Sequence, residues 1–119
     1  MAEYKLYSVI RTDIEIPVGK LLIQVSHAYL SVWWECLNVN PELAEKYKNE
    51  PAYPKISLKG KNEHALRRAQ EECKQLNIPT FLVIDAGRTV FKEPTVTVLG
   101  IGPVIPDDLP TYVKKLQLF

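Results

Sequence analysis

The spacing of apolar and polar positions predicts a strand and then a long helix at the start of the chain. Residues 4–10 are rich in aromatic and β-branched side chains, which favour a strand. From residue 18 to residue 38 apolar positions recur at helical spacing, and Pro17 and Gly19 stand near the start of this segment. We therefore expect a first strand followed by a largely buried first helix.

The middle of the chain predicts a helix, a strand and a further helix. Asn40 can cap a short, mostly exposed helix that begins at the next proline and ends before Pro51. Residues 55–59 alternate between polar and apolar side chains, as a strand with one solvated face does. Asn62 can cap the next helix, and Asn77 with the nearby proline ends it. The remaining expected elements are a buried strand at 80–84, a strand at 95–101, a short helix near 107–110 and an apolar tail at 116–119 that docks on the body.

This order of elements indicates the fold class. Strands that alternate with helices favour a single sheet covered by helices on both faces. We expect an α/β protein, a three-layer α/β/α sandwich with a single mixed β-sheet of about four strands. A chain of 119 residues is long enough for one domain with its own core, so the expected domain is residues 1–119.

Composition narrows the functional classes. The formal net charge is +1, so a polyanion partner would have to meet a local basic patch rather than a generally basic protein. Cys36 and Cys73 lack partners at metal-binding spacing, which predicts reduced core thiols and no zinc site. Neither a secretory signal nor a membrane span fits before residue 20. We expect a cytoplasmic protein with no membrane association.

Asp85 ends the apolar run that precedes it. Ligands of α/β proteins collect at the carboxyl ends of parallel strands, so a carboxylate at this point is placed to meet one. The alternative is that Asp85 closes a turn, because Asp-Ala-Gly is favourable turn chemistry. The sequence leaves both interpretations open.

A polar stripe marks the otherwise apolar first helix. Its members are spaced four, three and four residues apart and fall on one narrow face: Lys20, Gln24, His27 and Ser31. Lys20 lies in the first helical turn, where a positive charge is better suited to holding a bound anion than to stabilising the helix. The alternative is that the stripe is the solvent-facing edge of the helix.

Three stretches carry a resemblance to a known family: RTD at 11–13, GKLLIQVSHA at 19–28 and DAGRTVFKEPTVTVLGIGP at 85–103. In these stretches, and in NPEL at 40–43 and PKISLKG at 54–60, the chain resembles the type 2 peptidyl-tRNA hydrolases of archaea and eukaryotes. The resemblance implies a small α/β/α sandwich, commonly a homodimer. It also implies hydrolysis of the ester that joins a peptide to the 3′ ribose of tRNA, with neither a metal nor another cofactor.

The resemblance also assigns residues. The implied catalytic residues are Lys20, Asp85, Thr89 and Thr97, and the expected substrate-binding residues are Arg11, Gln24, His27 and Arg88. Ester hydrolysis needs a positioned water, a proton acceptor and donors for the oxyanion. We assign Asp85 to orienting or deprotonating water, Lys20 to the oxyanion or the 3′-terminal phosphate, and the threonines to hydrogen bonding.

The residues disfavour two other classes of function and leave one alternative open. Ser26 and His27 are adjacent on a helix and point in different directions, which disfavours a covalent acyl-enzyme. A nucleotide-binding domain would need a glycine-rich turn after the first strand, and the chain lacks one there. The alternative function is a catalytically silent member of the same fold that acts as an RNA- or protein-binding module.

The adjacent residues Trp33 and Trp34 bear on the homodimer. They cannot share one helix face, so at least one should lie outside the main intramolecular contact. Such a side chain either joins a dimer interface or is covered by the short helix after Asn40.

Overall fold

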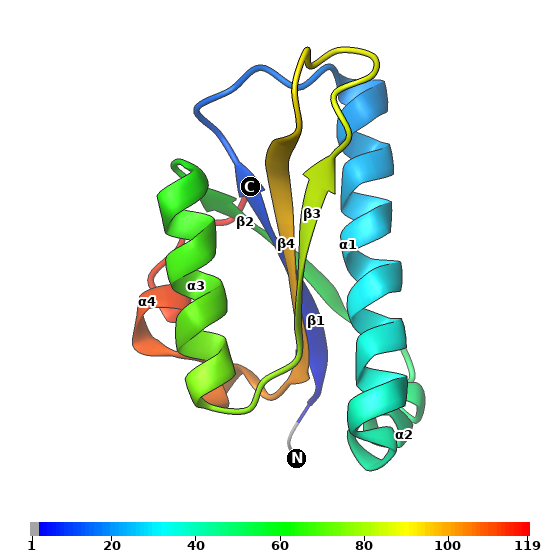
Figure 1. Cartoon of the computed structure of the whole chain (residues 1–119). Coiled ribbons are helices and arrows are strands. Elements are labelled where there is room, and N and C mark those ends of the chain that lie inside the picture. Colours follow the sequence, from blue (N-terminus) through cyan, green and yellow to red (C-terminus); the bar gives the residue numbers. More distant parts are fainter. Residues whose placement is uncertain (1–2) are drawn as a thin grey trace.

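A single four-stranded mixed sheet forms the middle layer of the structure (Figure 1). The computed structural model describes residues 3–119. The strands are β1 (Lys5–Arg11), β2 (Lys55–Gly60), β3 (Thr80–Asp85) and β4 (Thr95–Val104), in the spatial order β2-β1-β4-β3. β1 and β2 are parallel, and β4 is antiparallel to both β1 and β3. The carboxyl ends of β1, β2 and β3 therefore lie at the same end of the sheet.

Helices cover both faces of this sheet, which confirms the expected three layers (Figure 1). The long helix α1 (Val18–Val39) and the short α2 (Pro41–Lys48) lie on one side. On the other side lie α3 (Glu63–Gln75), a 3₁₀ turn η1 (Pro106–Asp108) and α4 (Thr111–Lys114). The short helix expected near 107–110 is replaced by η1 and α4, the other expected helices and strands are present, and β4 extends beyond the expected end at residue 101.

Local sequence signals set several helix ends. The side chain of Asn40 accepts a hydrogen bond from the Leu43 N–H at 3.2 Å, and that of Asn62 accepts one from the Ala65 N–H at 2.8 Å. Each satisfies a backbone donor that the first helical turn leaves unpaired. Asn77, just after α3, adopts a left-handed φ of 59°, as residues that terminate helices often do.

Three apolar clusters fill the space between the layers, and one of them packs Leu6 against Val32 and Tyr47 on the side of α1 and α2. On the α3 side the cluster includes Val9, Leu66 and Leu99, whereas the α1 side is filled around Ala28 and Val98. Helix α1 comes close to β4 at Gly100, where an added Cβ would lie 2.5 Å from the carbonyl oxygen of Ala28. A side chain at this position would therefore push α1 away from the sheet.

The expectation of a largely buried first helix is wrong. Helix α1 buries one stripe, made of Gln24, Ala28, Val32 and Cys36. A single sheet face contacts only one side of a helix, and α2 covers only the distal end of this one. Several large apolar side chains of α1 remain exposed as a result: Leu22, Ile23, Leu30, Trp34 and Leu37.

The expectation of a buried strand at 80–84 is also wrong. β3 is the outer strand of the sheet and pairs with β4 alone. Two of its large apolar side chains, Phe81 and Ile84, are 38% and 54% exposed. A continuous apolar run is therefore compatible with an edge strand as well as with a central one.

The expectations for the adjacent tryptophans and for the C-terminal tail are confirmed. Trp33 packs on Tyr47 of α2, with ring centroids 5.7 Å apart, while Trp34 is 57% exposed. The tail docks through its backbone: the Phe119 N–H donates to the Ser57 carbonyl at 2.9 Å. Across residues 3–119 no helix is both long enough and apolar enough to cross a bilayer.

Candidate active site

A β-bulge in β4 creates the polar site. Val83 of β3 pairs with Val98, but the next residue, Ile84, pairs with Val96, so Thr97 is the extra residue. Val96 packs in the cluster on the α3 side, whereas Thr97 hydrogen-bonds to a residue of α1. A bulge re-aims a side chain in this way, because it interrupts the regular alternation of faces.

Thr97 is the first member of a chain of polar contacts. Its hydroxyl donates to Oε1 of Gln24 at 2.6 Å, and Nε2 of Gln24 donates to Oδ2 of Asp85 at 3.2 Å. Nζ of Lys20 lies 2.8 Å from the same Oδ2 and donates to Oγ1 of Thr89 at 2.5 Å. All four residues assigned to catalysis, together with Gln24, are therefore in one connected cluster.

Burial divides this cluster into an inner and an outer part. Thr97 and Gln24 are 0% and 3% exposed, so they contact protein groups rather than solvent, and Gln24 contacts Asp85 directly. Asp85 is 8% exposed, the side chain of Lys20 is 18% exposed, and Thr89 is exposed. A ligand approaching from solvent would meet Thr89, Lys20 and the edge of the Asp85 carboxylate.

Asp85 closes a turn, as one interpretation of the sequence expected, and it also pairs with Lys20. Its Oδ1 accepts the Gly87 N–H at 2.8 Å, which is a turn-closing bond, while Oδ2 faces Lys20. The hydrogen bond from Lys20, followed by that from the Gly87 backbone, lowers the pKa of Asp85 below its ordinary value of 3.8. The carboxylate is therefore charged throughout the neutral and mildly acidic range.

The loop between β3 and β4 depends on Gly87. Its φ is +79°, and a Cβ added there would lie 2.4 Å from the carbonyl carbon of Glu93. Glycine thus lets the loop close on itself and return Thr89 toward Lys20. Phe91 of the same loop lies with its ring centroid 6.0 Å from the Lys20 ammonium. The turn that the Asp-Ala-Gly sequence favours is therefore present, with Gly87 in the left-handed conformation.

The polar stripe of α1 does not act as one unit. Lys20 and Gln24 reach the sheet, but His27, one position off the buried stripe, is exposed. Arg88, on the β3–β4 loop, is exposed as well. These two side chains lie outside the connected cluster, on the solvent side.

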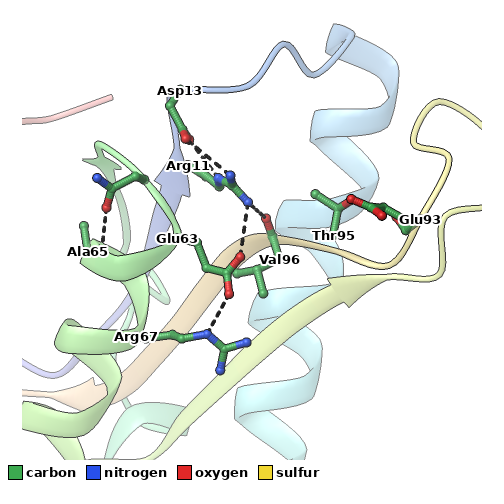
Figure 2. Close-up of polar contacts among 9 residues, drawn as sticks. Arg11, Asp13, Glu63, Ala65, Arg67, Glu93, Thr95 and Val96 are labelled. Atoms are coloured by element: carbon green, nitrogen blue, oxygen red, sulfur yellow. Dashed lines mark hydrogen bonds and ion pairs between the residues drawn. The ribbon is translucent and has the colours of Figure 1, made fainter.

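Arg11 lies on the opposite face of the sheet (Figure 2). Its guanidinium contacts Asp13, Glu63 of α3 and the carbonyl oxygen of Val96. The sheet therefore separates Arg11 from the Lys20–Asp85 pair. The sequence carries no local signal for the contacts of Arg11 with Glu63 and Val96, because both residues are distant from it along the chain.

No group of three or more His, Cys, Asp or Glu side chains in residues 3–119 is arranged to hold a metal ion. The positive charge at the site comes from the Lys20 ammonium.

Comparison with known proteins identifies the family. The family model described as "Peptidyl-tRNA hydrolase PTH2" matches residues 4–119. The chain belongs to the peptidyl-tRNA hydrolase PTH2 family. The match includes every member of the polar cluster and confirms the resemblance found in the sequence.

Individual members of the PTH2 family show the same similarity. The chain is 34% identical over 117 residues to "Peptidyl-tRNA hydrolase 2, mitochondrial" of Bos taurus, covering 98% of this chain and 65% of the relative. It is 35% identical over 102 residues to "Peptidyl-tRNA hydrolase" of Sulfurisphaera tokodaii, covering 83% and 84%. It is 34% identical over 115 residues to the protein of that name from Methanopyrus kandleri, covering 97% of both. The chain thus spans about two thirds of the bovine relative and nearly all of the second archaeal one.

Proposed function

We propose that this protein is a peptidyl-tRNA hydrolase that cleaves the ester between a peptide, or an N-blocked amino acid, and the 3′ ribose of tRNA. The observation that carries the proposal is the Lys20–Asp85 pair, 2.8 Å apart, at the surface of a PTH2-family fold. The names of the relatives support the same substrate. The reaction releases free tRNA and uses no metal or other cofactor.

The hydrogen-bonding capacity of Asp85 supports a role in orienting water. An ionised carboxylate offers about four acceptor positions. Oδ2 accepts from Lys20 and Gln24, and Oδ1 accepts from Gly87, which leaves one position on Oδ1 for a water molecule. Because the pKa of Asp85 is lowered, the carboxylate is a weak base. Its main contribution is then to hold the attacking water, with partial proton transfer in the transition state.

Lys20 supplies the complementary charge. An ammonium group has three N–H donors, of which one meets Asp85 and one meets Thr89. The third is available to an oxyanion that develops on the ester carbonyl, or to the 3′-terminal phosphate. Thr89 is exposed beside it and is suited to hydrogen-bond the substrate. Gln24 and Thr97 hold Asp85 in position from behind.

Binding of the RNA backbone would need positive charge away from this small site. Lys59, Lys61 and Lys115 line a shallow cavity of about 420 Å³ beside the ring of Tyr112. None of the described residues that line it is Asp or Glu. Lys59 belongs to β2, which lies three strand spacings from β3, or about 14 Å at about 4.8 Å each. The cavity is therefore separated from Asp85 by about this distance across the sheet. The cavity and the exposed Arg88 and His27 are the proposed contacts with the tRNA.

We also propose a homodimer formed through the exposed apolar face of α1 around Trp34. Exposed apolar side chains in such a group are typical of an interaction surface.

A cytoplasmic location is proposed as well, supported by Cys36 and Cys73, which are buried and free of disulfides, as in proteins of reducing compartments.

The test is hydrolysis of N-acetylaminoacyl-tRNA by the purified protein, followed by release of free tRNA. Turnover that is lost in Asp85→Asn but kept in Asp107→Asn supports the proposal, because Asp107 lies in η1, away from the cluster. If the folded wild-type protein binds tRNA without turnover, the silent RNA-binding module is the correct function instead.

A further inference from the structure

We propose that Arg11 is a positioning residue, which holds the β4 bulge from the far face of the sheet and thereby aims Thr97 at Gln24 and Asp85. The proposal rests on the proposed function, because it assigns a role within that active site. It replaces a direct contact of Arg11 with substrate.

The first step is the contact between Arg11 and the bulge. Regular pairing of β1 with β4 ends at Ile10 and Val98. Beyond that pair, Nη1 of Arg11 donates to the carbonyl oxygen of Val96 at 3.1 Å. The side chain of Arg11 thus continues the connection between the two strands where their backbones no longer pair. Figure 2 shows the guanidinium reaching across to this carbonyl.

The second step is the peptide plane. The carbonyl group of Val96 and the nitrogen and Cα of Thr97 belong to one planar peptide unit. A bond that fixes the Val96 oxygen therefore limits the rotation of the backbone that leads into Thr97. Because Thr97 is the extra residue of the bulge, it has no register partner of its own in β3. Arg11 provides a restraint on the β1 side of this unit, where the pairing between β1 and β4 has ended.

The third step is the transmission to the site. The Thr97 hydroxyl donates to Gln24 at 2.6 Å, which leaves the amide nitrogen of Gln24 to donate to Asp85. Every side chain between Arg11 and Asp85 is less than 10% exposed, so water does not readily replace these contacts. A rotation at Thr97 would thus reach the carboxylate that orients water.

Arg11 itself is held rigidly. Its Nε donates to Oδ1 of Asp13 at 2.7 Å and its Nη2 to Oδ2 at 3.3 Å, a two-point pairing. Oε1 of Glu63 lies 3.7 Å from Nη1. The side chain is only 15% exposed. These internal partners neutralise the charge and occupy donors that a phosphate would otherwise use.

The neighbouring ion pair supplies a matched control. Arg67 pairs with Oε2 of the same Glu63 at 2.8 Å but makes no hydrogen bond to Val96 (Figure 2). Arg67→Met therefore removes one arginine from the same network and leaves the bulge restrained. Arg11→Met removes the restraint and keeps a side chain of similar length.

The kinetic test compares these variants on full-length N-acetylaminoacyl-tRNA and on a short N-acetylaminoacyl ester of the terminal adenosine. We expect Arg11→Met to lower kcat by roughly 10- to 100-fold on both substrates, as small misplacements of catalytic groups do. The KM for tRNA and its salt dependence should stay at wild-type values, and Arg67→Met should match the wild type. An increase in KM for tRNA alone, with a weaker salt dependence and unchanged kcat, would show that Arg11 binds phosphate and would overturn the proposal.

A second measurement does not depend on activity. The side-chain amide protons of Gln24 report on the site by NMR, because one of them is bonded to Asp85. They should move toward solvent-exposed values in Arg11→Met and stay in place in Arg67→Met. Unchanged Gln24 signals in Arg11→Met would contradict the proposal, even if the wild type proved to have no hydrolase activity. Should Arg11→Met fail to fold, Asp13→Asn loosens the same guanidinium and must shift the Gln24 signals in the same direction.

Discussion

The ammonium of Lys20 lies 2.8 Å from Oδ2 of Asp85 and joins the first turn of α1 to the last residue of β3. The two residues belong to different elements, which come together only when the fold forms. The contact exists because α1 packs closely over β4 at Gly100 and extends to the sheet edge where β3 ends. The pair is therefore a property of the packed layers rather than of either segment.

The first prediction concerns the carboxylate. Asp85→Asn should lower turnover of N-acetylaminoacyl-tRNA by roughly two to four orders of magnitude, the range for losing a general acid–base group. Binding of uncharged tRNA, measured by fluorescence anisotropy, should change little, because Lys20 and the lysine cavity remain. Wild-type turnover in this variant would mean that Asp85 only closes a turn.

The second prediction concerns pH. Because hydrogen bonds from Lys20 and Gly87 depress the pKa of Asp85, Asp85 stabilises the fold above the unfolded-state pKa, near 3.8. This stabilisation is lost as the pH falls through the lower folded-state value. NMR titration of the Asp85 carboxyl carbon should give a midpoint below 3.8, and Lys20→Met should raise it. A midpoint that Lys20→Met leaves unchanged would show that the ion pair does not form in solution.

The third prediction concerns RNA binding. If about three to five basic side chains meet phosphates, the logarithm of tRNA affinity should fall with the logarithm of salt concentration at a slope of roughly −2 to −4.5. Replacing Lys59, Lys61 and Lys115 by alanine should flatten this slope by roughly 2 to 3. The control replaces three exposed lysines at the other end of the fold: Lys46, Lys48 and Lys74. Equal losses in both triple variants would exclude the cavity as a specific contact.

The fourth prediction concerns assembly. At micromolar concentration the wild-type protein should sediment as a dimer, and Trp34→Lys should sediment as a monomer. Trp34 is 57% exposed, so lysine there does not disturb the core of the protomer. Leu118→Lys, at another exposed apolar position, should leave the dimer intact. A monomeric wild type would remove the homodimer from the proposed function.

Local chemistry made the elements predictable. Asn40 and Asn62 cap helices through contacts within a few residues, and the apolar run ends at Asp85. Features of this short range can be predicted from the sequence. Lys20 was also identified from its place in the first turn of α1.

The pairing between distant segments could not be predicted from the sequence. Alternation along β4 places Thr95 and Thr97 on one face of a regular strand, and only the register of β3 against β4 reveals the bulge that turns Thr97 toward α1. The exposure of α1 and the edge position of β3 depend in the same way on which layers meet. The sheet face that the side chain of Arg11 takes could not be deduced from spacing alone either.

The docked tail makes the two edges of the sheet unequal. Lys59 donates its N–H to the Gln117 carbonyl at 2.8 Å and Leu118 bridges to Leu58, so part of the outer side of β2 is already occupied by backbone. Within residues 3–119, β3 pairs only with β4, and its apolar side chains Phe81 and Ile84 are exposed. Unpaired edges of this kind recruit further strands. Under partial destabilisation, self-association by strand addition should therefore begin at β3, the strand that ends in Asp85, and should inactivate the site as it proceeds.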